Sequence, residues 1–145
     1  MNKKDLLKEE LSNLYAICKQ VNSYMNGSEI DFLTEKHQLL LMDYLKAVCQ
    51  CEDNTSTILS ELDINPTNTT DSIVNEITDN LKNIIVQDID NDVKAPGYLL
   101  SLNRLMNYQL ANLENIQYIS TDEVNMDILN DLKGNFQKLK NNLLN

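Results

Sequence analysis

The sequence has few of the residues that interrupt regular secondary structure. It contains three glycines, two prolines and no tryptophan among 145 residues. The glycines lie far apart, so the chain lacks the glycine-rich loops that bind phosphates in P-loop and dinucleotide-binding proteins. No segment alternates apolar and polar residues with a period of two, so no β-sheet is expected. These absences leave long helices as the favoured structure.

Positive charge is also scarce. Lysine and arginine total 12 against 22 acidic residues, which gives a formal net charge of −10. A domain that binds DNA through its phosphates needs a basic surface, so we expect no direct nucleic-acid binding. No apolar run is long enough to cross a membrane, and hydrophobic residues, at 42%, are too common for a disordered acidic tail. We therefore predict a soluble protein with one domain over residues 1–145.

The three cysteines give no obvious disulfide pattern. Cys49 and Cys51 are too close to bridge if both lie on one helix, and Cys18 falls among apolar residues. No apolar segment follows the charged N-terminus as it does in a secretion signal. These features predict a reducing, cytoplasmic location, with Cys18 packed in the core as an apolar residue.

Apolar residues recur at intervals of three and four along most of the chain, as they do on one face of a helix. The spacing favours left-handed packing of neighbouring helices, and short connections favour antiparallel neighbours. We predict an all-α fold, an antiparallel bundle of four to five long helices, with a short extra helix in the 52–69 connection. The long helices are expected over residues 3–25, 28–51, 70–91, 98–119 and from 120 onward.

Several helix boundaries are marked by capping and breaking residues. Asn2 is a suitable N-cap for the first helix, and Asn26-Gly27 is a suitable stop. This leaves a loop of about three residues before Ser28, where the second helix is expected to begin. Ala95-Pro96-Gly97 predicts a break before the fourth helix. Ser120 and Glu123 match a capping box for the last helix.

The excess negative charge is concentrated in one segment. Residues 52–92 hold ten acids and one base, whereas the remaining residues hold twelve acids and eleven bases. On the predicted third helix, Asp88 falls on the inward stripe, and Asp90 and Asp92 follow it. Negative charge at the C-terminal end of a helix is unfavourable, by about 0.3–1 kcal/mol per charge. The cluster resembles the start of a calcium loop, but Val93 stands where glycine is needed, which excludes an EF-hand.

Catalytic and metal-binding patterns are each missing a member. A di-iron bundle needs two Glu-x-x-His motifs, and the chain has one histidine, His37, with no glutamate three residues before it. A cysteine nucleophile needs a nearby base, and His37 lies about 20 Å along the helix from Cys51. We favour a His37 that is either partly buried and hydrogen-bonded across the bundle or placed at the edge of the apolar stripe. No catalytic, cofactor-binding or metal-binding residue is predicted.

These observations favour a non-enzymatic interaction protein, an adaptor or inhibitor, that binds a basic protein through an acidic face at residues 52–92. The candidate binding residues are Asp79, Asp88, Asp90 and Asp92. One alternative is an acidic inhibitor from a phage or mobile element that occupies a nucleic-acid-binding cleft. A second is a metal-binding or enzymatic bundle that uses His37 with a thiol. A leftover apolar helix face would also allow a homodimer.

Overall fold

The computed structural model describes residues 1–66, 68–120, 122 and 124–145, and all regular secondary structure in these residues is helical. The prediction of an all-α bundle is confirmed. No helix in this part of the chain is both long and apolar enough to span a bilayer. The five helices are α1 (Lys3–Met25), α2 (Glu35–Glu61), α3 (Ser72–Val86), α4 (Asn91–Ile119) and α5 (Met126–Leu143).

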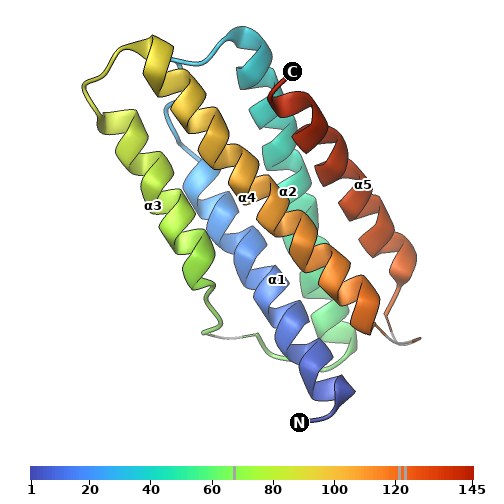
Figure 1. The fold of residues 1–145 in the computed structure, drawn as a ribbon. Helices are drawn as coiled ribbons and strands as arrows, with labels where there is room; N and C mark the ends of the chain where they lie inside the picture. Colours follow the sequence, from blue (N-terminus) through green and yellow to red (C-terminus); the bar gives the residue numbers. More distant parts are fainter. Residues whose placement is uncertain (67, 121, 123) are drawn as a thin grey trace.

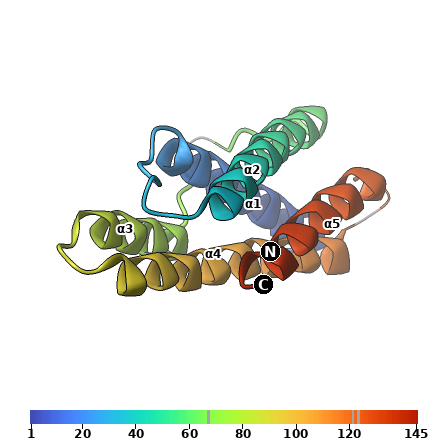
Figure 2. The same ribbon diagram turned by 90° about the horizontal axis from the view of Figure 1, so that it is seen from above.

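Four of the helices form a ring, and the fifth lies outside it. α1 contacts α2, α2 contacts α5, α5 contacts α4, and α4 contacts α1. Each of these neighbours runs antiparallel to the next (Figure 1). α3 contacts only α1 and α4, and therefore covers the outer surface of that pair. Viewed from above, α3 lies on one side of the molecule, and α2 and α5 lie on the other (Figure 2).

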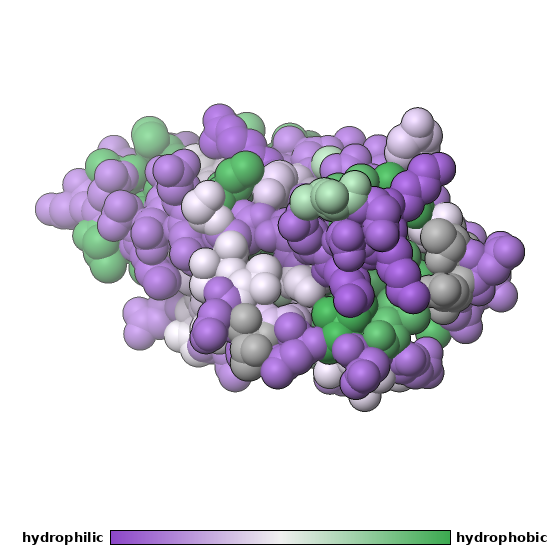
Figure 3. Space-filling view, turned by 90° about the horizontal axis from the view of Figure 1, so that it is seen from below, coloured by the Kyte–Doolittle hydropathy of each residue, from purple (hydrophilic) through white to green (hydrophobic). Residues whose placement is uncertain are grey.

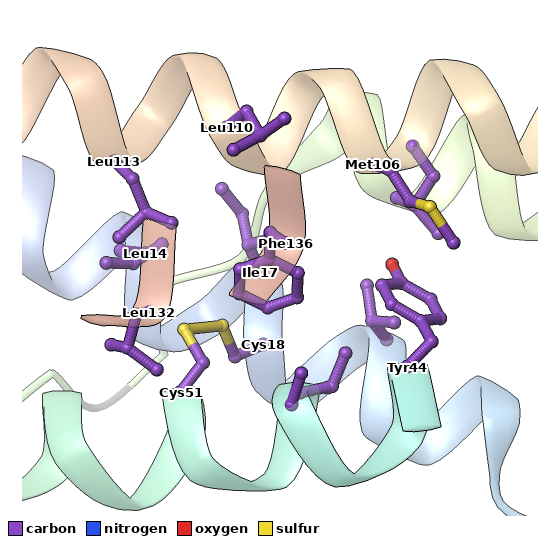
Figure 4. Packing of buried hydrophobic residues seen from close by; sticks show 14 of the residues in the cluster. Leu14, Ile17, Cys18, Tyr44, Cys51, Met106, Leu110, Leu113, Leu132 and Phe136 are labelled. Carbon is purple, nitrogen blue, oxygen red and sulfur yellow. A yellow bond between two sulfur atoms is a disulfide. The ribbon is translucent and has the colours of Figure 1, made fainter. Parts of the chain in front are cut away.

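The core forms where the inward stripes of the four ring helices meet. Leu14, Ile17, Leu113, Leu132 and Phe136 surround the sulfur atoms of two cysteines near its centre (Figure 4). All five side chains are buried. The end of the bundle that carries the N-terminus is mostly hydrophilic, with smaller hydrophobic areas at the lower right and at the left of the view (Figure 3).

The first helix matches its predicted boundaries. Asn2 and Asp5 form a capping box, in which the Asn2 side chain accepts from the Asp5 N–H and the Asp5 side chain accepts from the Asn2 N–H. This exchange satisfies donors that have no partner within the helix. α1 ends at Met25, as the Asn26-Gly27 stop predicts, and Gly27 has a φ of +88°, a value that suits glycine.

The second helix begins later than predicted. Its N-cap is Thr34, so Asn26–Thr34 replaces the expected three-residue loop. Cys18 and Cys51 lie side by side. Along the helix axes, Cys18 is ~10 Å from the end of α1 at Met25, and Cys51 is ~24 Å from the beginning of α2 at Glu35. The first turns of α2 therefore project ~14 Å beyond α1, as the ribbon shows (Figure 1). Leu39 and Met42, on these turns, are exposed.

No separate short helix forms between residues 52 and 69 in the described part of that connection. α2 instead continues without a break to Glu61, and the apolar residues Ile58 and Leu59 are buried on its last turns. These two residues therefore extend the buried stripe of α2, and the expected extra helix is the last part of that helix.

The predicted breaks around α4 and α5 are misplaced. α4 begins at Asn91 and contains Pro96, so Ala95-Pro96-Gly97 does not end a helix. Proline removes one main-chain hydrogen bond, and the carbonyl that loses it belongs to Asp92, which is exposed to water. Ser120 is the C-cap of α4, whereas the N-cap of α5 is Asn125. Glu123, the other half of the predicted capping box, lies outside the described residues.

Candidate functional site

The acidic residues of 52–92 are distributed over distant parts of the molecule. Glu52 and Glu61 lie on α2 and Asp79 lies on α3, and these two helices do not touch. Asp88 and Asp90 lie between α3 and α4, at the opposite end of the molecule from the α2–α3 connection (Figure 1). The segment therefore supplies several small acidic areas.

Asp88, Asp90 and Asp92 lie together at the connection between α3 and α4. α3 ends at Val86, so Asp88 is not on its inward stripe and is exposed. Asp90 is the N-cap of α4 and Asp92 lies in its first turn. The positive end of the helix dipole favours acidic residues there. The sequence predicted that Asp90 and Asp92 lie at the C-terminal end of the third helix, where negative charge is unfavourable. They lie instead at the N-terminal end of α4, where negative charge is favourable.

Three exposed apolar side chains accompany these acids. Val86 is 79% exposed, Ile89 41% and Val93 62%. We call residues 86–93 the α3–α4 corner. Lys94 is turned away from it, since its Nζ donates to the Ile85 carbonyl oxygen at 3.0 Å and lies 5.9 Å from the centre of the Phe32 ring. The corner therefore combines apolar surface with negative charge, and among the described residues no cation forms an ion pair with its aspartates.

Asp79, the fourth candidate residue, lies outside the corner. It is exposed on α3, and its Oδ1 lies 3.9 Å from Lys82 Nζ. Exposed ion pairs of this kind contribute little to stability, typically ~0–1 kcal/mol. The structure thus brings three of the four candidate residues together and places Asp79 apart from them.

One acid of the segment has a structural role that the sequence did not indicate. Asp71 is only 5% exposed and is the N-cap of α3. Its Oδ1 accepts from the Val74 N–H at 2.8 Å, and its Oδ2 accepts from Asn13 Nδ2 at 2.9 Å and Tyr108 Oη at 2.7 Å. This carboxylate therefore links α3 to both α1 and α4.

Gln20 of α1 completes this connection. Its Oε1 accepts from the Asp71 N–H at 2.8 Å, and its Nε2 donates to the Asp71 carbonyl oxygen at 3.0 Å and to Asn75 Oδ1 at 2.6 Å. The start of α3 is thus fixed to α1 by side-chain and main-chain hydrogen bonds together.

Two further polar contacts lie inside the core. Tyr44 donates its hydroxyl to Oε1 of the buried Gln109, whose Nε2 has no hydrogen-bond partner among the described residues. The hydroxyls of Tyr24 and Tyr98 share a hydrogen bond of 2.8 Å. Burial raises the pKa of both Tyr44 and Tyr98, because the phenolate is poorly solvated in the core.

These raised pKa values predict a loss of stability in alkali. A tyrosine whose pKa is higher in the folded state stabilises the fold below pH ~10, and this contribution is lost as the pH rises further. We expect the free energy of unfolding, measured by urea denaturation, to fall above pH ~10 by up to about 1.4 kcal/mol per pH unit for each of Tyr44 and Tyr98. Tyr44→Phe should reduce this slope, and an unchanged slope would contradict the assignment.

His37 has structural partners on both ring nitrogens. Nδ1 lies 3.0 Å from Thr34 Oγ1, and Nε2 lies 3.1 Å from the Leu143 carbonyl oxygen on α5. The predicted half-buried histidine, hydrogen-bonded across the bundle, is confirmed. Among the described residues, no group of three histidine, cysteine or acidic side chains is arranged to hold a metal ion.

The cysteines differ from their predicted state in one respect. Cys18 is fully buried in the core, as expected, but it forms a disulfide with Cys51, with a Cα–Cα distance of 6.1 Å (Figure 4). This pair was missed from the sequence because a three-residue loop was expected between α1 and α2. Such a loop would place the residues around His37, and not Cys51, opposite Cys18. The signal was that both cysteines occupy inward stripes of neighbouring helices.

Cys49 remains unpaired by disulfide and is a poor nucleophile. Burial and the carboxylates of Glu52 and Asp53 raise the pKa of its thiol, and Sγ lies 3.6 Å from Asn22 Oδ1. A raised pKa lowers the fraction of reactive thiolate. The Cys49 thiol is therefore less reactive than an ordinary exposed thiol.

Comparisons with known proteins supply no relative. The chain matches no protein-family model, no curated protein sequence and no solved structure at a significant level.

Proposed function

We propose that this chain is a non-enzymatic interaction protein that binds a basic protein partner through the α3–α4 corner. The observation that carries the proposal is the combination, within eight residues, of three exposed apolar side chains with three aspartates outside any ion pair of the described residues. Apolar contact supplies affinity in such a surface, and the surrounding charge supplies partner selection and speeds the encounter.

The remaining chemistry of the described residues supports a binding role. The ring nitrogens of His37 contact a threonine hydroxyl and a main-chain carbonyl, and two of the three cysteines are joined. The alternative of a thiol and histidine site would require Cys49, the cysteine outside the disulfide, to meet His37, and the two lie about 18 Å apart along α2.

The alternative of a nucleic-acid mimic from a phage or mobile element receives less support. Such a protein needs an extended acidic surface to occupy a nucleic-acid-binding cleft. The acids of 52–92 are divided between the two ends of the bundle, and Asp71 is buried. A compact corner is better suited to a local protein contact.

The cytoplasmic location remains a prediction. The Cys18–Cys51 disulfide favours the opposite conclusion, because disulfides persist in oxidising compartments and are rare in the cytosol. Alkylation of the protein in freshly broken source cells, followed by mass spectrometry, decides between the two locations.

Charge reversal at the corner tests the proposed function. Asp88→Lys with Asp92→Lys should reduce capture of a basic protein from source-cell extract by about tenfold or more, since like charges placed opposite each other cost several kcal/mol. Glu9→Lys with Glu114→Lys is the matched control, because it changes the net charge equally at exposed positions on α1 and α4. Equal capture by both variants, or no capture by the unmodified chain, would overturn the proposal.

A further inference from the structure

A groove between α2 and α5 occupies the side of the bundle remote from α3. It is lined by Leu39, Leu40 and Ala47 of α2 and by Leu139 of α5, and encloses about 580 Å³. In the four-helix ring, the pair α1 and α4 has its outer surface covered by α3, whereas α2 and α5 have no covering helix within the described residues. The groove is thus the uncovered counterpart of the surface on which α3 packs.

Part of the apolar surface at this groove is exposed to water. Leu39, in the lining of the groove, is 55% exposed, and Met42, outside the lining on a neighbouring turn of α2, is 56% exposed. Folding of one chain does not bury these side chains.

The groove carries positive charge in an otherwise acidic protein. Lys36, Lys46 and Lys138 line it, with Asp43 as the single acid. Lys36 donates to the Asn145 carbonyl oxygen at 2.9 Å. Among the described residues, Lys46 and Lys138 take part in no hydrogen bond or ion pair. Two ammonium groups therefore flank an apolar floor.

The complementary surface is present on the same chain. The α3–α4 corner offers Val86, Ile89 and Val93 for the apolar floor and its aspartates for the lysines. We propose that the groove between α2 and α5 binds the α3–α4 corner of a second copy of this chain. This inference rests on the proposed function, because it uses the same corner as the docking surface.

The placement of the two surfaces defines the type of assembly. The corner lies on the α3 side of the molecule and the groove on the side of α2 and α5 (Figure 2). One copy therefore uses its corner on one neighbour and its groove on another, which is a heterologous, head-to-tail contact. At physiological ionic strength the Debye length is ~8 Å, so the repulsion between two chains of charge −10 is screened while the close contacts remain.

Light scattering over a series of protein concentrations tests this contact. The molar mass of the unmodified chain should rise above 16.6 kDa as the concentration increases. Lys46→Glu with Lys138→Glu should weaken the association by about tenfold or more, and so should Asp88→Lys with Asp92→Lys. Lys3→Glu with Lys8→Glu alters the charge equally at exposed positions on α1 and should leave the association close to that of the unmodified chain.

A mixture of the two charge-reversed variants is the decisive sample. The groove variant retains an unmodified corner, the corner variant retains an unmodified groove, and the two reversed surfaces are opposite in charge to each other. An equal mixture should therefore regain the association that each variant alone has lost. A mass that stays at 16.6 kDa for the unmodified chain, or in the mixture while the unmodified chain associates, would overturn the inference. Association of the groove variant alone would do the same.

The outcome is separable from that of the proposed function. A groove variant that captures the basic protein from extract but no longer self-associates supports both statements. A chain that stays monomeric while its corner variant loses capture overturns the self-association and leaves the docking role of the corner intact.

Discussion

Reduction of the Cys18–Cys51 disulfide will lower the free energy of unfolding by about 4 kcal/mol. The two cysteines are 33 residues apart, and the bond restricts the unfolded chain by closing this loop. Because this loop includes the connection from α1 to α2, the bond also fixes the position of α2 along the axis of α1. Urea denaturation with and without reductant measures the effect.

The same bond is tested by counting reactive thiols. Denatured but unreduced protein should take up one alkyl group, at Cys49, and reduced protein should take up three. Cys49→Ser is the matched control, because it removes a thiol without touching the bond and should leave the reductant-dependent loss of stability unchanged. Uptake of three alkyl groups without reductant would contradict the disulfide.

Asp71→Ala will lower the free energy of unfolding by about 3 kcal/mol. Loss of the N-cap accounts for ~1 kcal/mol. Asn13 and Tyr108 would also lose their acceptor, and each buried donor left without one costs ~1–3 kcal/mol unless it relaxes toward water. Thermal and urea denaturation followed by circular dichroism provide the measurement.

Two variants show whether this loss comes from the hydrogen bonds. Asp71→Asn keeps an acceptor for the Val74 N–H and should lose about half as much stability. Asp88→Ala removes an exposed acid of the same segment and should change the stability by less than about 0.5 kcal/mol. If Asp71→Ala is no more harmful than Asp88→Ala, Asp71 does not anchor α3.

The features of this fold that could be predicted are those determined by residues close to one another in the sequence. Asn2 and Asp5 lie three residues apart, and their capping box requires nothing from the rest of the molecule. The inward stripes of α1 and α4 follow from spacing in the same way. Their apolar members are all buried: Leu7, Leu11, Leu14, Cys18, Val21 and Met25 on α1, and Leu99, Leu102, Leu105, Met106, Leu110, Leu113 and Ile116 on α4.

The position of each helix along the axis of its neighbour could not be predicted, because it depends on tertiary contacts. The loop after Asn26 is extended by residues that pack on α4, where Phe32 forms an edge contact with Tyr98 with ring centres 5.3 Å apart. Nothing in the local sequence marks this contact. The missed disulfide follows from the longer loop, because the loop shifts α2 along α1 and brings Cys51 opposite Cys18.

The candidate site was predicted in composition but not in geometry. Asp88, Asp90 and Asp92 are indeed clustered and exposed. Their electrostatic setting was wrong because Pro96 was taken as a helix break, which moved the beginning of α4 by two turns. The role of Asp71 was missed because its donors, Asn13 and Tyr108, are distant in sequence.

Because α3 lies outside the four-helix ring, the residues needed for folding are separate from those that form the exposed corner. Its inner residues, Val74, Thr78 and Leu81, are buried against the ring and must be kept for folding. Residues 86–93 contribute little to the core, so substitutions there alter the surface at small thermodynamic cost. The docking surface that we propose can therefore change in sequence while the bundle beneath it keeps its fold.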